Sequence, residues 1–564
     1  MNSLLLALTA LILYIIAYRT YGRFLARRIF KIDPTARCPS ETHHDGVDFV
    51  ATDKLVLFGH HFTSIAGTGP IVGPAIAIIW GWLPALIWIL VGSIFMGAVH
   101  DFGSMIISMR NEGRSIGDLA GSIISPRVKV LFMLIIFFAL WIVIAIFGVV
   151  IASVFSLFPA AVLPVWLQLP IAIWLGVMVY KKGKSHIVYG IIATLLMYAT
   201  IVLGAFLPVE LPALGNLSSA GTWVILLLVY AYIASILPVT TLLQPRDYIN
   251  AFQLCIAMAL LLLGILVVHP PMVAPVADFS PEGAPAIFPL LFITVACGAI
   301  SGFHCLVSSG TTSKQCDSEA SAQPISYGGM LLEGLLAIIV IIACGAGIGL
   351  GLEKEGVLYT GVEAFNQQYP SWQSAQGLGA KIEAFVTGAS NIIAGLGLPP
   401  GIGITIMGVF VASFAATTLD TATRIQRYII SEIAASCKVP VLTKKHPATF
   451  IAVFTALLLA FSSGGGKGAL ALWPLFGAIN QLLGGLALLV ITVWLARKNS
   501  PIIYTAIPMV FMIVITGWAM KINLIDFYAQ GEWLLFSIGF LITILQTWMV
   551  VEGTIVLARL RKKS

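Results

Sequence analysis

The sequence predicts an all-α polytopic membrane protein, and three observations support this fold class. Of the 564 residues, 59% are hydrophobic and only 10% are charged, with a mean hydropathy of +0.99. Soluble domains, in contrast, carry about 25% charged residues. Apolar stretches of about 20 residues, enough to cross a bilayer, recur along the chain. Lysine and arginine gather in alternate loops between them. We therefore expect about 15–18 transmembrane segments in a lipid bilayer, and no nucleic-acid partner despite the net charge of +7.

The loop charges also predict the orientation of the chain. Loops 157–163, 208–222 and 269–286 contain neither lysine nor arginine, whereas the loops on the other side are cationic. Because cationic loops face the cytoplasm, we expect the N-terminus outside and the C-terminus in the cytoplasm of a bacterial or archaeal inner membrane. Residues 1–18 are apolar and are followed, not preceded, by cations. This charge order is typical of an uncleaved first helix.

Residues 58–74 form the most informative segment, because they break the pattern of a membrane helix. They contain two histidines, four glycines and two prolines inside a long apolar stretch. Irregular backbone survives at bilayer depth only where protein encloses it or where it lines a cavity, so this composition predicts a broken helix at a binding site. A half-helix beginning near Pro70 would direct its N–H groups at an anionic group such as a carboxylate. The candidate substrate-binding residues here are His60, His61, Thr63, Ser64, Gly67, Thr68 and Gly69.

A second interruption is expected within residues 223–245, where Pro238 and Pro245 occur. Each interrupted span would lead five helices, and the two groups would run in opposite directions. This is the arrangement of a LeuT-like 5+5 inverted-repeat core with added peripheral helices. The alternative is that Pro238 only kinks a structural helix. The predicted organisation is an extra helix and cytoplasmic loop (1–54), a first repeat (55–207), an inverted repeat (223–352), a periplasmic loop with a re-entrant segment and a following helix (353–447), and accessory helices (448–564).

Ionisable residues inside predicted spans are candidates for ion coupling, because such residues are costly at that depth. His100 and Asp101 lie well inside the span 85–109, and an ionised Asp101 needs a partner, for which His60, His61 or Arg246 are candidates. Protons are the expected coupling ion, and a purely structural pair is the alternative. The pairs Arg246–Asp247 and Asp420–Arg424 are expected to have structural or gating roles, the latter because i, i+4 spacing places both on one helix face.

Residues 297–314 are rich in glycine and hydroxyl groups. Ser301 and His304 are further candidates for substrate binding, and Ser308, Ser309 and Thr312 for ion binding if sodium is the coupling ion. Close helix packing through small residues is the alternative. No cofactor or metal is expected, since the zinc-type ligands His60, His61, His304 and Cys305 lack the spacing of a closed zinc site.

Four motifs resemble the carbon starvation protein A family. They are residues 60–74, residues 298–304 with 308–312, residues 419–427, and residues 472–477 with 480–483. The resemblance implies an inner-membrane carrier for short peptides, or in some relatives for pyruvate, made when carbon is scarce. An enzyme is not expected, because the sequence contains no HExxH or GxSxG motif. A membrane nutrient sensor without transport is the alternative from another class, although no output domain is visible. The oligomeric state is not predicted.

Overall fold

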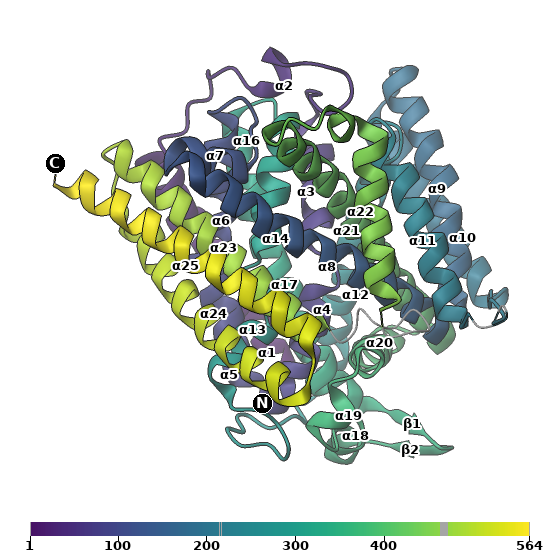
Figure 1. Cartoon of the computed structure of the whole chain (residues 1–564). Helices are drawn as coiled ribbons and strands as arrows, with labels where there is room; N and C mark the ends of the chain where they lie inside the picture. Colours follow the sequence, from purple (N-terminus) through teal and green to yellow (C-terminus); the bar gives the residue numbers. More distant parts are fainter. Residues whose placement is uncertain (1, 214, 216, 463–471, 563–564) are drawn as a thin grey trace.

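The computed structural model describes residues 2–213, 215, 217–462 and 472–562, and these are almost entirely helical (Figure 1). Residues 463–471, which follow the predicted helix that begins at 448, lie outside the described residues. One short hairpin, β1 (Leu352–Lys354) and β2 (Val357–Tyr359), lies with α18 (Gly361–Gln368) and α19 (Trp372–Ala375) at one end of the molecule. The N-terminus is at this end, whereas α2 (Pro39–Thr42) and α7 (Ile116–Ile123) mark the opposite end. The predicted all-α architecture is confirmed.

Twelve helices in the described part of the chain are long and apolar enough to cross a membrane, or 13 with one bent pair. This is fewer than the 15–18 expected, because α22 (Lys445–Ala460) is short and another segment is interrupted. The twelve are Ser3–Ile29 (containing α1, Ser3–Ala17), Trp82–Met109 (α5, Trp82–Gly92; η4, Ser93–Gly97; α6, Ala98–Met109), Pro126–Leu157 (α8), Pro159–Lys181 (containing α9, Val162–Gly176), His186–Phe206 (α10), Ser219–Ile236 (α11), Leu243–Val268 (α12), Glu319–Leu350 (containing α16, Glu319–Ala322, and α17, Gly328–Ile342), Pro400–Ser436 (α21), Trp473–Arg497 (α23), Ile503–Gln530 (α24) and Trp533–Arg561 (α25).

The bent pair is the first predicted break. Helix α3 (Lys54–Ile65) ends in the middle of the apolar stretch, and α4 (Gly69–Ala77) begins after three residues at an angle of 44°. Pro70 occupies the first turn of α4, where its missing N–H costs nothing because that group has no helical partner. The interruption is therefore encoded locally by glycine and proline, and this prediction is confirmed.

The expected interruption within residues 223–245 is wrong. Helix α11 is continuous to Ile236, and residues 237–242 form a turn before α12 begins at Leu243. Pro238 lies in this turn, and Pro245 lies in the first turn of α12, where proline is tolerated. The prolines therefore separate two helices and do not break one.

The second interrupted span is instead found at residues 287–315. Helix α13 (Ile287–Thr294) is followed by the non-helical residues 295–301 and then by α14 (Gly302–Val307). The π-helical turn η7 (Ser308–Thr312) and α15 (Ser313–Gln315) complete this span. The sequence predicts that residues 297–314 belong to the third helix of the second repeat. In the structure they belong to the first helix of that repeat, which is interrupted.

Two series of five spans follow from this assignment. Seven crossings lie from α3 to the start of α13, so the interrupted helix of the second series runs opposite to that of the first. Corresponding spans pack together: α8 on α21, α11 on α22, and α17 on α5. We infer repeats at 54–268 and 287–497 in place of the expected 55–207 and 223–352. The hairpin of α9 and α10 is an insertion in the first repeat.

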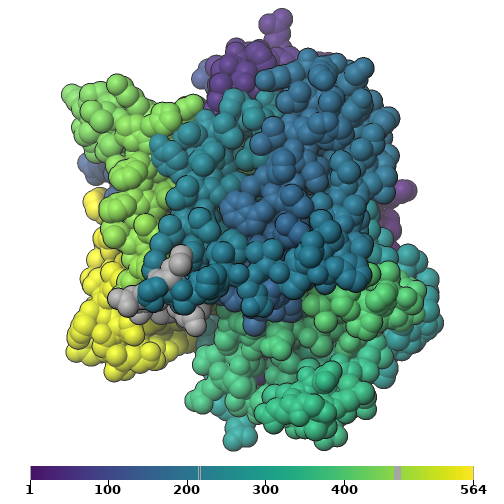
Figure 2. All heavy atoms as spheres, turned by 90° about the vertical axis from the view of Figure 1, so that its right-hand side faces the viewer, coloured from purple at the N-terminus to yellow at the C-terminus, as the bar shows by residue number. Residues whose placement is uncertain are grey.

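The outer surface of the inserted hairpin is apolar. Figure 2 shows α9 and α10 covering one face of the molecule. Exposed side chains there include Leu195 (65% exposed) and Phe206 (75% exposed). Lipid tails solvate such groups at no cost, whereas water does not, so this face contacts the bilayer. Helix α20 (Leu378–Ala394), in the region expected to be re-entrant, is not among the membrane-length helices and packs against α4 and α21.

Candidate functional site

The two helix interruptions touch each other at the centre of the molecule. A Cβ atom added to Gly69 would lie 2.2 Å from Sγ of Cys297, which is in the second interruption. A Cβ atom added to Gly73 would lie 2.4 Å from the carbonyl oxygen of Thr294. Because such distances are shorter than van der Waals contact, only glycine allows this approach. The sequence therefore uses glycine to bring the first turns of α4 against the end of α13 and the second interruption.

Two small cavities lie beside this contact. One is lined by Ile65, Gly67, Gly69, Val143, Phe147, Cys297, Phe303, Thr418 and Phe476. A second shares Val143, Phe303 and Phe476 with the first, and extends along α8 and α23. The first cavity therefore combines apolar walls with the glycine backbone of the first interruption.

The two interruptions differ in how their half-helices begin. At the start of α14, the N–H of Phe303 donates to Oδ1 of Asn480 at 2.9 Å. At the start of α4, Thr68 makes no capping hydrogen bond, and its Oγ1 is buried without a partner. The N–H groups of Ile71 and Val72 both donate to the carbonyl of Thr68, at 3.1 and 2.9 Å, and Pro70 has no N–H. The hydroxyl of Thr68 is thus the group at the start of α4 that has no partner among the described residues.

A chain of carboxyl and imidazole groups lies next to the second interruption. The carboxylate of Asp101 accepts hydrogen bonds from Nδ1 of His100 at 2.8 Å and from Nδ1 of His304 at 3.0 Å. The other nitrogen of His304, Nε2, lies 3.3 Å from Oε2 of Glu333 on α17. All four side chains are fully buried. The expectation that His60, His61 or Arg246 would pair with Asp101 is wrong, because His100 and His304 take that place.

Glu333 is a functional candidate that the sequence analysis missed. It is the only acidic residue between Ser321 and Leu350, in a stretch otherwise fit for a membrane helix. An isolated carboxyl group at that depth signals a site by default, so the signal was present in the sequence. The glycine and histidine motifs of residues 58–74 are a stronger local signal than this single carboxyl group.

His60 and His61 point to different neighbours. Nδ1 of His60 lies 2.6 Å from Oδ2 of Asp247 on α12, whereas Nδ1 of His61 lies 2.9 Å from Oγ1 of Thr312. Helix α3 is still regular at both positions, so the two side chains diverge by about 100°. The Nε2 atoms of both histidines are buried without a hydrogen-bond partner. Asp247 thus pairs with a histidine of the first interrupted helix.

The predicted pairing of Asp420 with Arg424 is wrong, although both residues lie on α21. Asp420 accepts hydrogen bonds from Arg246 and, at 2.7 Å, from the hydroxyl of Tyr230. Arg424 instead donates to Oδ1 of Asp48 at 2.9 Å. Asp420 and Arg424 therefore each pair with side chains from other segments and not with each other.

The predicted hydroxyl groups do not converge on one cation site. Ser309 donates to the carbonyl of Cys305 at 2.6 Å, while Thr312 bonds His61, and Ser308 is buried without a partner. In the first interrupted helix, Thr63 donates to the carbonyl of Gly59 at 2.8 Å. The remaining two predicted hydroxyls bond side chains of other helices: Ser64 with Thr421 and Ser301 with Asn480.

Comparison with known proteins places this geometry in context. Residues 2–519 match the protein-family model described as Carbon starvation protein CstA. The chain is 34% identical to the peptide transporter CstA of Campylobacter jejuni, over 91% of this chain and 79% of that protein. It is 30% identical to the pyruvate/proton symporter BtsT of Escherichia coli, over 94% of this chain and 83% of that protein.

Solved structures give a weaker likeness. A mutant of a manganese transporter from Eremococcus coleocola aligns with 92% of this chain and 99% of its own, at a TM-score of 0.43 and 12% identity. The transporter MhsT in complex with L-phenylalanine aligns with 83% of this chain and 99% of its own, at a TM-score of 0.45 and 14% identity.

Proposed function

Because this chain belongs to the carbon starvation protein CstA family, we propose that it is a secondary active transporter that imports short peptides together with protons across the inner membrane when carbon is limiting. Membership of this family makes it a multi-pass transport protein and agrees with the expectation that it is not an enzyme. The identity of the substrate, the coupling ion and the orientation of the chain in the membrane are our proposals.

The contact between the two interrupted helices is the observation that carries the proposal. Unwound backbone is stable at bilayer depth only in a protein-enclosed or solvated site, and here two helices interrupted by such backbone meet beside a cavity. The unpartnered hydroxyl of Thr68 at the start of α4 offers a hydrogen-bond donor to the carboxylate of a peptide. Apolar walls from Val143 and Phe476 suit its side chains.

Proton coupling is supported by the imidazole of His304 between two carboxyl groups, Asp101 and Glu333. An imidazole can bond Asp101 through Nδ1 in either protonation state, while Nε2 gains or loses a proton toward Glu333. One proton taken up or released by this group changes the net charge beside Cys297 in the second interruption. That change can favour one arrangement of the two half-helices over the other.

Pyruvate is a second candidate substrate, and the close packing of the site favours it. The enclosed space beside Gly69 is far smaller than the roughly 300–1,000 Å³ that is usual for ligand pockets. A three-carbon acid therefore requires less separation of the two interruptions than a peptide does. The pyruvate/proton symporter of E. coli at 30% identity is consistent with this candidate.

Uptake into proteoliposomes tests both candidates. The purified chain is reconstituted and supplied with labelled dipeptide or labelled pyruvate, with and without an inward proton gradient. We expect dipeptide to accumulate only with the gradient. Accumulation of pyruvate alone would favour the second candidate, and accumulation of neither would contradict the transport proposal.

A further inference from the structure

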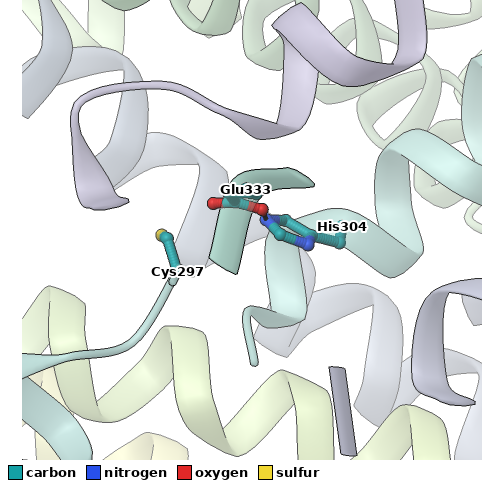
Figure 3. A group of neighbouring side chains, drawn as sticks. All are labelled: Cys297, His304 and Glu333. Atoms are coloured by element: carbon teal, nitrogen blue, oxygen red, sulfur yellow. Dashed lines mark ion pairs between the residues drawn. The ribbon is translucent and has the colours of Figure 1, made fainter. Parts of the chain in front are cut away.

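Three potential metal ligands converge at the second interruption (Figure 3). Sγ of Cys297, a ring nitrogen of His304 and a carboxylate oxygen of Glu333 all lie within 4.8 Å of one another. They come from three separate segments: the non-helical residues 295–301, helix α14 and helix α17. All three residues are buried. Figure 3 shows the imidazole and the carboxylate next to each other, with the thiol directed toward the carboxylate.

The polar atoms of this group have unused bonding capacity. Neither Nε2 of His304 nor either oxygen of Glu333 makes a hydrogen bond of ordinary geometry, and the 3.3 Å between Nε2 and Oε2 is an ion-pair contact only. Leaving a buried polar atom unsatisfied costs about 1–3 kcal/mol. The thiol of Cys297, in contrast, donates to Oγ of Ser301 at 3.6 Å. An unsatisfied imidazole nitrogen next to an unsatisfied carboxyl group needs a physical explanation.

The surroundings of His304 match those of a metal-bound histidine. Metal-bound imidazoles almost always donate their second N–H to a carboxylate or a carbonyl, which fixes the orientation of the ring. Here Nδ1 of His304 donates to Asp101 at 3.0 Å, and Asp101 is held in turn by His100 at 2.8 Å. This pairing directs the lone pair of Nε2 toward Glu333 and Cys297.

We propose that Cys297, His304 and Glu333 bind a soft divalent transition-metal ion, with zinc as the representative. A thiolate, a carboxylate and a neutral imidazole are ligands that zinc prefers, at about 2.0–2.3 Å. Their two negative charges neutralise the dication, which removes much of the cost of burying it. Cys297 lies outside any helix, so its thiol can approach the other two ligands with little loss of helical structure.

The bound ion would hold the second interruption to α17, because its three ligands come from separate segments. In the proposed function, on which this effect rests, transport requires the two interruptions to move relative to each other. The bound ion would therefore inhibit transport.

The sequence-based zinc candidates are only partly included in this site. His304 is a ligand, whereas the thiol of Cys305 donates to the carbonyl of Gly302 at 3.0 Å, and His60 and His61 bond Asp247 and Thr312. Cys305 is therefore a matched control: it is a fully buried cysteine one residue after His304 with no place in the proposed site.

Cobalt(II) absorption of the purified full-length chain in detergent tests the proposal. The exposed thiols of Cys255 and Cys437 are first removed as Cys255→Ser and Cys437→Ser, so that they do not bind metal. We expect a near-ultraviolet thiolate-to-cobalt band together with visible bands of a tetrahedral ion, both abolished by added zinc. Cys297→Ser should remove the thiolate band, and Cys305→Ser should retain it.

Two further variants separate binding from folding. Glu333→Gln should weaken cobalt binding by about tenfold or more, and Asp101→Asn, which acts only through His304, by about 10–100-fold. Size-exclusion profiles and melting temperatures establish that each variant is folded. A folded parent without the thiolate band, or a band that survives Cys297→Ser, would overturn the metal site. Proton-driven uptake with a chelator present would still stand in that case, so the two proposals fail separately.

Discussion

Glu333 places a carboxyl group inside the membrane with no hydrogen bond of ordinary geometry. Among the residues that the structure describes, its only ionisable neighbour at ion-pair distance is His304, at 3.3 Å. An ionised carboxylate there depends on the imidazolium for its stability, and a neutral carboxyl group does not. The two residues therefore change charge together. Asp101, on the other side of the imidazole ring, keeps the proton exchange within these three residues.

Glu333→Gln tests this coupling, because it keeps the shape of the side chain and removes its charge. We expect uptake driven by a proton gradient to fall by about tenfold or more, while exchange of labelled for unlabelled substrate at equal pH persists. Counterflow in proteoliposomes measures the second quantity. Glu383→Gln, an exposed position on α20, is the control and should transport normally. Equal loss of both activities would remove Glu333 from proton coupling.

Gly69→Val tests the contact between the interruptions. Even the first side-chain atom would lie 2.2 Å from Sγ and 2.6 Å from Cβ of Cys297, so the two half-helices must separate. We expect uptake to decrease by about tenfold or more with normal insertion into the membrane. Gly517→Val is the control, because a Cβ atom there meets nothing within 4 Å. Wild-type uptake by the Gly69 variant would show that this close approach is not needed.

At the scale of elements, α21 links the interrupted helix to the end of the molecule that carries α2. Thr417 donates to the backbone carbonyl of Thr63 at 3.0 Å, near the end of α3. Further along α21, three side chains surround the carboxylate of Asp48: Arg424 at 2.9 Å, Tyr428 at 2.6 Å and Arg427 at 3.6 Å. We call these four residues the Asp48 cluster. A rigid helix with contacts at both ends can transmit movement between them.

The Asp48 cluster should stabilise the fold above acidic pH. Burial alone would raise the pKa of Asp48, but Arg424, the hydroxyl of Tyr428, Arg427 and Lys314 together hold this pKa below its ordinary value. A lowered pKa contributes stability that is present above the ordinary value of about 3.9 and is lost as the pH falls through the lower value. Asp48→Asn should therefore cost about 1–3 kcal/mol at pH 7.

Thermal unfolding in detergent measures this effect. The melting temperature of Asp48→Asn should lie below that of the parent at pH 7, and the difference should shrink as the pH falls below about 4. Asp526→Asn on α24, at an exposed position, should change stability by less than about 0.5 kcal/mol. A difference that does not depend on pH would contradict the proposed charge pairing.

Elements with local signals could be predicted from the sequence, and elements defined by distant contacts could not. Glycine and proline after His61 locate the first break, since they act on their own backbone. The second break has no proline between Val295 and Ser301. Asn480 caps its second half from a helix nearly 180 residues away. For the same reason His304 could be named as a candidate, whereas its pairing with Asp101 and Glu333 could not.

At the scale of the whole molecule, the spans enclose a core that lipid does not reach. Helix α23 and the span Glu319–Leu350 are almost entirely buried, whereas α10 and α25 expose apolar side chains along their length. The site lies on the enclosed helices. The cationic loops gather at the end of the molecule that carries α2 and α7, and for this end the positive-inside rule predicts a cytoplasmic location.

Labelling of Cys437 tests this orientation. Cys437 is exposed at the end of α21, so a membrane-impermeant maleimide should label it in inverted vesicles and not in intact cells. Ser280→Cys in a Cys437→Ser background, on the opposite side of the molecule, should give the reverse result. Labelling of Cys437 from outside the cell would invert the assigned topology.

The contact of Gly69 with Cys297 has a consequence for permeability. Gly69 and the side chain of Cys297 touch without room for a methyl group, so water cannot pass between them. Opening on one side must preserve this seal toward the other, since the same atoms close both routes. Cells that produce the protein should therefore keep their ionic gradients intact when no solute is present.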